Sequence, residues 1–147
     1  MRLVGTGRAH DRAFFVAVVR HLHESGFQVE GLWAGGRRGA RRDAAAAGIA
    51  VAGGGLSHRR RALDALAAAD VHLCCARSSR LPKPVQQSAE LGVVTIVRDA
   101  PAFDGLAVPF AVAEVTDVAL LWPSVTHPDT RQEGVRMLSA VVARAVR

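Results

Sequence analysis

The sequence predicts an α/β fold in which one doubly wound, mostly parallel sheet carries helices on both faces. Two observations predict it. Short apolar runs alternate along the whole chain with segments whose apolar residues recur at helical spacing. The runs themselves are continuously apolar, which is typical of parallel strands that are buried on both sides. The chain of 147 residues is long enough for one sizeable core, so residues 1–147 are expected to form a single domain.

The first half of the chain is expected to hold three strands and three helices. A short strand at Leu3 and Val4 breaks at the turn Gly5-Thr6-Gly7. Asp11 is the expected cap of a helix to about Glu24, whose apolar residues keep helical spacing until Gly26. The other expected elements are a strand at 28–34, the turn Gly35-Gly36, an Arg- and Ala-rich helix ending at Gly48, a strand at 49–52, the turn Gly53-Gly54-Gly55 and a helix from a cap at Ser57 to Ala69.

The second half continues the alternation. The expected elements are a buried strand at 71–75, a polar loop at 76–84, a helix at 85–91, a strongly apolar strand at 93–97, a loop after Asp99, a helix near 112–121, a turn marked by prolines and a last helix at 129–144. Parallel strands joined by helical crossovers form an open sheet of the Rossmann-like kind. No internal repeat or linker interrupts this order.

The charge balance is strongly basic, with a formal net charge of +6 at pH 7. Arginine supplies almost all of it, since Lys83 is the single lysine. The densest clusters lie at 37–42 and 59–61, and no aromatic residue lies among them to stack on a base. A solvated basic face is therefore the preferred interpretation, and nucleic acid is not expected as a partner. An anionic partner, for instance a nucleotide, stays as the alternative.

Membrane, secretory and disulfide classes are not favoured. No apolar stretch approaches the ~20 residues of a membrane span, and the first residues lack the apolar region of a signal peptide. Cys74 and Cys75 are adjacent, so on a strand they point to opposite faces and do not bridge. A cytoplasmic protein is expected.

Glycines and arginines gather where the predicted strands end, which is the edge where open parallel sheets bind ligands. The backbone can approach a ligand closely there at Gly7, Gly35, Gly36 and Gly53. Glycine is equally expected in any turn that joins a strand to a helix, so these residues alone are weak evidence for a site. Arg8 and Arg12 flank the first turn, and planar guanidinium groups suit phosphate oxygens. The two arginines therefore either bind a diphosphate together, as a clamp, or are ordinary solvent-exposed residues of a loop.

Other chemistries are less well supported. A dinucleotide fingerprint starting at Gly5 would need a third glycine where His10 stands, and no acid ends the second strand, so an NAD(P) site is disfavoured. The six histidines form no metal-binding pattern, and no metal is expected. His10 lies near the ligand edge, whereas His72 is expected in the core. Cys75 has no base at a recognisable spacing, so no catalytic residue is assigned.

Several segments, taken together and in order, resemble the C-terminal domain of the glycosyltransferase group 1 family, which has the GT-B fold. The segments are VGTGRAHDRAFFVAVVRHL, VEGLWAGG, ALDALAAADVHL, SAELGVVTIVRDAP, GLAVPF, AEVTDVALLW and HPDTRQEGV. The third, around Ala69 and Asp70, is the most specific. The resemblance covers nearly the whole chain, which no single motif would.

The resemblance implies a domain that binds a nucleotide-diphosphate sugar. It places Arg8 and Arg12 on the donor diphosphate, and it puts Ser79 and Gln87 where the family has two acids that contact the donor sugar and the ribose. The loop between them begins at Arg80. The implied binding residues are Gly7, Arg8, Arg12, Gly35, Gly36, Gly53, Ser79, Arg80 and Gln87.

The resemblance also implies what the domain works with. Glycosyl transfer would need an acceptor-binding domain, which this chain is expected to obtain from a partner subunit or to lack. Self-association into a homo-oligomer is the other expected arrangement. No cofactor is expected, because the nucleotide sugar is a substrate. The alternative, favoured by the missing acids, is a non-catalytic domain that binds a nucleotide or a protein.

Overall fold

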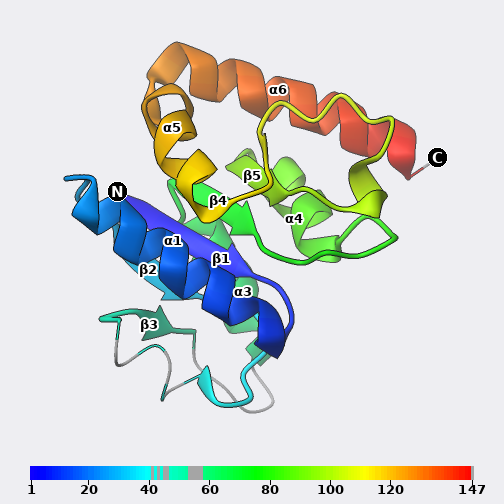
Figure 1. Cartoon of the computed structure of the whole chain (residues 1–147). Helices are drawn as coiled ribbons and strands as arrows, with labels where there is room; N and C mark the ends of the chain where they lie inside the picture. The colour runs from blue at the N-terminus through cyan, green and yellow to red at the C-terminus, as the bar shows by residue number, and fades with distance from the viewer. Residues whose placement is uncertain (41, 43, 45–46, 53–57, 147) are drawn as a thin grey trace.

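The computed structural model describes residues 1–40, 42, 44, 47–52 and 58–146. Within them, all strand pairs are parallel and form one sheet with the order β3-β2-β1-β4-β5-β6 (Figure 1). The strands are β1 (Arg2–Thr6), β2 (Glu30–Trp33), β3 (Ala50–Val51), β4 (Val71–Cys74), β5 (Val94–Arg98) and β6 (Ala111–Val112). The order reverses at β1 and β4, as in a doubly wound sheet. The predicted fold class is confirmed.

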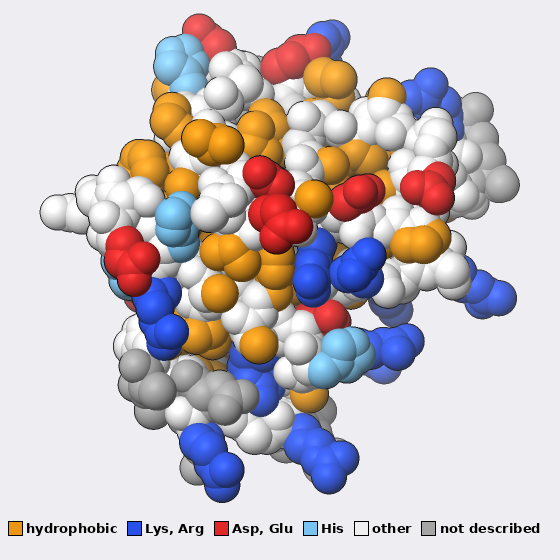
Figure 2. Space-filling view, in the orientation of Figure 1, with side chains coloured by type: hydrophobic (Ala, Val, Ile, Leu, Met, Phe, Trp, Pro, Cys, Tyr) orange, Lys and Arg blue, Asp and Glu red, His pale blue; other side chains and the backbone are white. Residues whose placement is uncertain are grey.

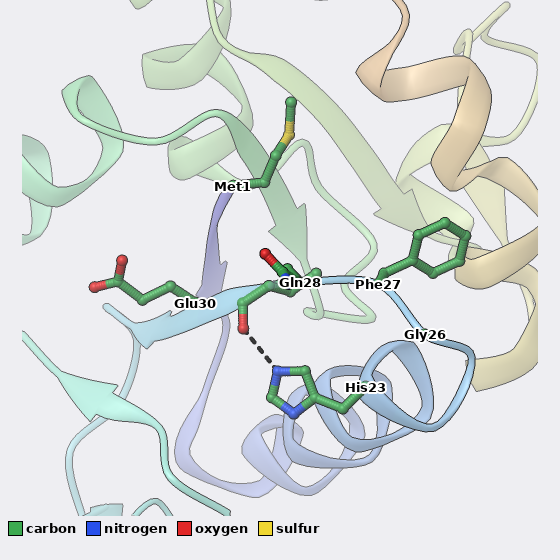
Figure 3. A pocket seen from close by; sticks show the side chains of 7 residues that line it. Met1, His23, Gly26, Phe27, Gln28 and Glu30 are labelled. Atoms are coloured by element: carbon green, nitrogen blue, oxygen red, sulfur yellow. Dashed lines mark hydrogen bonds between the residues drawn. The ribbon is translucent and has the colours of Figure 1, made fainter.

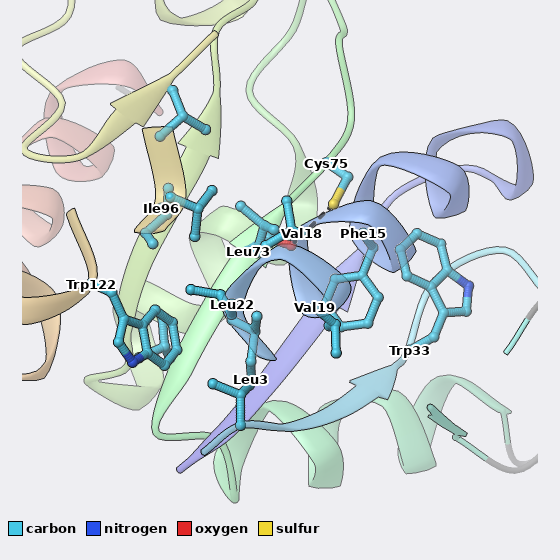
Figure 4. Packing of buried hydrophobic residues seen from close by; sticks show 14 of the residues in the cluster. Leu3, Phe15, Val18, Val19, Leu22, Trp33, Leu73, Cys75, Ile96 and Trp122 are labelled. Carbon is cyan, nitrogen blue, oxygen red and sulfur yellow. Dashed lines mark hydrogen bonds between the residues drawn. The ribbon is translucent and has the colours of Figure 1, made fainter. Parts of the chain in front are cut away.

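Helices cover both faces of the sheet. The helices α1 (Arg12–Glu24) and α5 (Val115–Thr126) pack on one face, and α3 (His58–Ala67), α4 (Lys83–Leu91) and α6 (Pro128–Ala145) pack on the other. Figure 4 shows the core under α1, where side chains from β1, β2, β4 and β5 meet the helix. Its labelled members include Leu3, Phe15, Val18, Val19, Leu22, Trp33, Leu73, Cys75, Ile96 and Trp122. Burying such side chains is the main stabilising contribution.

Helix α1 forms as the sequence predicts, but Asp11 plays a different part from the expected one. Asp11 stands at the N-cap of α1 without bonding any N–H of that helix. Its Oδ2 accepts a hydrogen bond of 2.8 Å from the backbone N–H of Arg8 instead. The reason is the 3-10 turn η1 (Ala9–Asp11), which precedes α1 and turns the carboxylate back toward the end of β1.

The segment after β5 differs most from expectation. A short sixth strand, β6, pairs with β5 where a helix start was expected, and α5 begins only at Val115. Pro123 lies inside α5 and not in a turn. Buried Val118, Trp122 and Val125 keep helical spacing on both sides of the proline, and their burial outweighs the lost backbone hydrogen bond. The turn falls at His127, before Pro128.

The remaining boundaries agree within a few residues. Strand β1 runs through Gly5 and Thr6, and α4 begins at Lys83, before the expected Val85. The helix expected before Gly48 lies partly outside the described residues. The turn at 53–55 and the cap at Ser57 lie wholly outside them.

A chain of buried polar side chains crosses the sheet. His72 is fully buried on β4, with its Nε2 2.7 Å from Thr6 Oγ1 and its Nδ1 3.3 Å from Thr95 Oγ1. Thr95 Oγ1 lies 2.8 Å from Ser88 Oγ on α4. The chain therefore links three adjacent strands and a helix, and every member has a partner, as buried polar groups require. His72 is the satisfied core histidine that the sequence predicts.

The buried imidazole should make the protein sensitive to acid. Burial lowers the pKa of His72 from 6.5 to about 3. The unfolded chain binds a proton below about pH 6.5 while the folded chain does not, so stability falls as the pH drops from 6.5 toward 3, by about 1.4 kcal/mol per pH unit. We expect His72→Gln to remove this dependence. Urea unfolding at pH 4, 5, 6 and 7 would measure it, and parallel pH profiles for the two proteins would contradict it.

Candidate functional site

The carboxyl ends of β1, β2 and β4 meet around a hollow of about 290 Å³, here called the apolar hollow. It is lined by Thr6, Gly7, Arg8, Ala34, Gly35, Cys74, Ala76, Ser78, Pro82 and Pro84. Most of these groups are apolar side chains or backbone, so the hollow suits a flat or apolar ligand part. The start of α4 closes one side of it.

A second hollow of about 260 Å³, here called the polar hollow, adjoins the first. It is lined by Arg8, His10, Asp11, Ala76, Arg77, Ser78 and Ser79. Arg8, Ala76 and Ser78 line both hollows, so the two form neighbouring parts of one edge. Figure 2 shows basic side chains along the lower and right-hand parts of the molecule, over the start of α1 and the loops at this edge.

Arg8 lines both hollows and follows the turn at the carboxyl end of β1. Its backbone is fixed on both sides, because its N–H donates to Asp11 and its carbonyl accepts 2.9 Å from the N–H of Asp11. Its side chain is exposed and pairs with none of the described carboxylates. A fixed backbone with an exposed guanidinium fits a phosphate contact.

Arg12 departs from the predicted clamp. Its side chain is buried, with Nη1 donating to the carbonyl of Gly36 at 2.9 Å and Nη2 to that of Arg38 at 2.6 Å. It lines neither hollow. The clamp prediction is corrected accordingly: α1 presents this guanidinium to the loop after β2, where it holds two carbonyls in place of a ligand.

The predicted glycines allow the loop after β2 to pack closely against the loop after β1. A Cβ on Gly35 would lie 2.4 Å from the carbonyl oxygen of Gly7, and one on Gly36 would lie 2.5 Å from the backbone N of Ala9. The N–H of Gly36 donates to the same Gly7 oxygen at 2.9 Å. Gly7 and Gly35 line the apolar hollow, whereas Gly36 lines neither. Gly53 lies outside the described residues.

Of the predicted site residues after β4, some lie at the polar hollow and one lies on α4. Ser79 lines the polar hollow, and Arg80 is exposed beside it. Gln87 is half-buried on α4 and lines neither hollow. Two residues not singled out from the sequence, Arg77 and Ser78, line the site. Their place directly after the carboxyl end of a buried strand is the signal that points to them.

Ser78 shapes this loop. Its Oγ donates to the carbonyl of Arg80 at 2.6 Å, and its own carbonyl accepts from the N–H of Ala102 at 2.9 Å. The second bond ties the loop to the 3-10 turn η3 (Pro101–Phe103) after β5. The residues that border the polar hollow are thus held at Ser78.

The cysteines do not act as nucleophiles here. Cys74 packs with α4 and α6 and Cys75 with α1 and α5, so the two point to opposite faces and remain free thiols, as predicted. Burial raises the pKa of Cys74 to about 11 and that of Cys75 well above its ordinary value. Neither forms a thiolate near neutral pH.

Comparison with known proteins gives one kind of similarity. No protein-family model matches the sequence, and no curated protein matches it either. Among solved structures, the chain is similar to the C-terminal domain of a glycosyl transferase group 1 family protein (LpcC) from Francisella tularensis. The TM-score is 0.70 at 14% sequence identity, over 99% of this chain and 85% of that one.

This chain has the fold of a group 1 glycosyltransferase C-terminal domain. The resemblance found in the sequence is confirmed at the level of the fold. None of the helices in the described residues is long and apolar enough to cross a membrane. The described residues also contain no cluster of His, Cys, Asp and Glu that could hold a metal ion.

Two larger hollows of this chain lie at the opposite end of the sheet, where the strands begin. One of about 530 Å³ is formed where α1 leads into β2 (Figure 3). His23 lines it, but its Nε2 bonds the carbonyl of Val29 at 2.7 Å, and Glu30 adds a negative charge. The other, of about 370 Å³, lies beside Gly92 and Pro128. At the carboxyl edge, where open parallel sheets bind ligands, the exposed residues Arg8 and Arg77 line the polar hollow.

Proposed function

We propose that this chain binds a nucleotide-diphosphate sugar at the carboxyl edge of its sheet and serves as the donor-binding part of a glycosyl transfer system. The observation that carries the proposal is that Arg8, an exposed residue, lines both the apolar and the polar hollow. The apolar hollow suits the nucleoside, and Arg8 suits the diphosphate that follows it. Arg8 takes this role without Arg12.

The start of α4 adds to the anion site. Pro82 and Pro84, at the beginning of this nine-residue helix, line the apolar hollow. A helix N-terminus carries partial positive charge, but Pro82 and Pro84 lack the N–H with which a helix end donates to an anion, so the contribution proposed here is that of the helix dipole. In glycosyl transfer, negative charge builds on the leaving diphosphate, and Arg8 and this helix end would stabilise it.

Among the residues described, the two hollows offer groups that suit the sugar donor but no exposed carboxylate that could activate the hydroxyl of an acceptor. Asp11 is the one carboxylate among the residues that line the two hollows, and it is buried and bonded to the backbone of Arg8. It is therefore not placed to deprotonate an acceptor hydroxyl. Transfer would require a partner subunit, or a second copy, that brings the acceptor and excludes water.

A second candidate function is non-catalytic nucleotide binding. Ser79 in the polar hollow and Gln87 outside both hollows favour it, since neither is an acid. An NAD(P) site is not favoured by the geometry. Strand β2 ends at Trp33 and leads into Ala34 and Gly35, so it offers no acid for a ribose hydroxyl there.

We expect Arg8→Gln to weaken binding of a nucleoside diphosphate by about 10- to 100-fold, the value of a charge-assisted hydrogen bond. The corresponding nucleoside should bind almost unchanged, because it makes no contact with the guanidinium. Calorimetric titration with UDP, GDP and dTDP beside uridine, guanosine and thymidine measures both. Arg20→Gln, at an exposed position of α1, is the matched control and should bind as the wild type does.

Two results would contradict the proposal. Equal losses for diphosphate and nucleoside in Arg8→Gln would remove the guanidinium from the phosphate site. Binding of NAD in preference to all three nucleoside diphosphates would replace the function itself.

A further inference from the structure

We propose that the polar hollow receives a second anionic group of the ligand, so that the donor's glycosyl unit carries a carboxylate, as in a nucleotide-activated uronic acid. The inference rests on the proposed function, because it takes the diphosphate to lie at Arg8 between the hollows. It adds the chemical class of the sugar, which that function leaves open.

Arg8, Arg77 and Ser79 bring hydrogen-bond donors to the polar hollow, whereas Ser78 already donates its one hydroxyl hydrogen to the carbonyl of Arg80. Arg77 and Ser79 line this hollow and not the apolar one, and Arg8 and Ser78 border both. Guanidinium groups donate and never accept, while a serine hydroxyl does either. A neutral sugar presents hydroxyl groups, which are held best when both donors and acceptors face them. A carboxylate only accepts, and it suits such a lining better.

The one acid of the hollow does not balance these donors. Asp11 is 4% exposed, its Oδ2 accepts from the backbone N–H of Arg8 at 2.8 Å, and its Oδ1 lies 3.5 Å from Nε2 of His10. The carboxylate is therefore almost covered by protein and offers a ligand little surface. His10 itself is 74% exposed, which leaves its ring at the rim of the hollow.

The loop that forms the far wall is basic along its length. Residues 76–83 include Arg77, Arg80 and Lys83, all exposed, and no Asp or Glu. Ser78 fixes the loop through its bonds to Arg80 and Ala102, so the backbone that carries Arg77 is held in place. Of these three cations, Arg77 lines the polar hollow, where a uronate carboxylate would meet its guanidinium.

An anion in this hollow could come from a different molecule, for instance the phosphate of an acceptor. The hollow shares Arg8, Ala76 and Ser78 with the nucleoside side, so it directly continues the path of the donor. For that reason we assign the anion to the donor sugar. The titrations below distinguish it from the phosphate of another molecule.

The test compares UDP, UDP-glucose and UDP-glucuronic acid by calorimetric titration of the whole chain, with GDP, GDP-mannose and GDP-mannuronic acid as the guanine series. The uronate donor should bind about tenfold more tightly than its neutral counterpart, as one charge-assisted hydrogen bond predicts. Arg77→Gln should abolish that preference and leave affinity for the nucleoside diphosphate within about twofold. Arg20→Gln should keep the preference. The preference should also shrink at high ionic strength, because the groups are exposed.

The outcomes separate this proposal from the proposed function. If the nucleoside diphosphate binds and the uronate donor has no advantage, the carboxylate proposal is overturned and the donor site stands. If neither nucleoside diphosphate binds, the proposed function fails first. In a further arm, inorganic phosphate is titrated into protein saturated with the diphosphate. Phosphate binding that requires Arg77, together with no preference for uronate, would assign the anion to another molecule and overturn the proposal.

Discussion

Arg12→Met should lower the free energy of unfolding by about 2–3 kcal/mol, although Arg12 carries a charge near the surface loops. Its buried guanidinium donates to the carbonyls of Gly36 and Arg38, and methionine fills similar space without any donor. Gly36 keeps one partner, because Trp33 Nε1 also donates to its oxygen at 2.8 Å. The carbonyl of Arg38, an exposed residue, also loses its bond from Arg12, and the loss of charge-assisted hydrogen bonds of this kind costs about 1.5–3 kcal/mol.

Urea unfolding measures this change, and the exposed neighbour provides the control. Arg20→Met lies on the same helix and should stay within about 0.5 kcal/mol of the wild type. Arg12→Lys should fall between, since an ammonium group keeps the charge but does not span two carbonyls as a planar fork does. Wild-type stability for Arg12→Met, with a large loss of diphosphate affinity, would restore Arg12 to the predicted clamp.

Gly35→Ala should damage both stability and binding. The new Cβ would lie 2.4 Å from the carbonyl oxygen and 2.7 Å from the backbone N of Gly7, and backbone atoms do not move aside as a flexible side chain does. The two loops must separate, at a cost of about 1–3 kcal/mol. Because Arg8 follows Gly7 directly, its guanidinium moves with that loop, and we expect at least a tenfold loss of nucleoside diphosphate affinity.

Gly48→Ala separates this clash from ordinary glycine effects. Gly48 has a φ of 67°, and a Cβ added to it would meet no atom within 4 Å, so alanine there is strained by its backbone alone. We expect a loss of about 1–2 kcal/mol in the free energy of unfolding and unchanged binding. If Gly35→Ala binds the diphosphate as tightly as Gly48→Ala does, the close packing of the two loops does not position Arg8.

Much of the fold follows from local patterns. Phe15, Val18, Val19 and Leu22 keep helical spacing in the sequence and are buried in the structure, so α1 could be placed before any tertiary information. Strand β6 could not, because two residues carry no periodicity. It exists through its pairing with β5, where the N–H of Asp99 donates to Val112 at 2.8 Å.

The sequence by itself determined most of the strands and helices along the chain and the position of Arg8 just after β1, because each depends on spacing along a few neighbouring residues. Only the tertiary structure decided that Arg12 donates to carbonyls of the loop after β2, that Gly35 packs against Gly7 and that Arg77 lines the polar hollow. Those partners lie far apart along the chain, or on different strands, and side-chain direction there is set by which loop packs beside which.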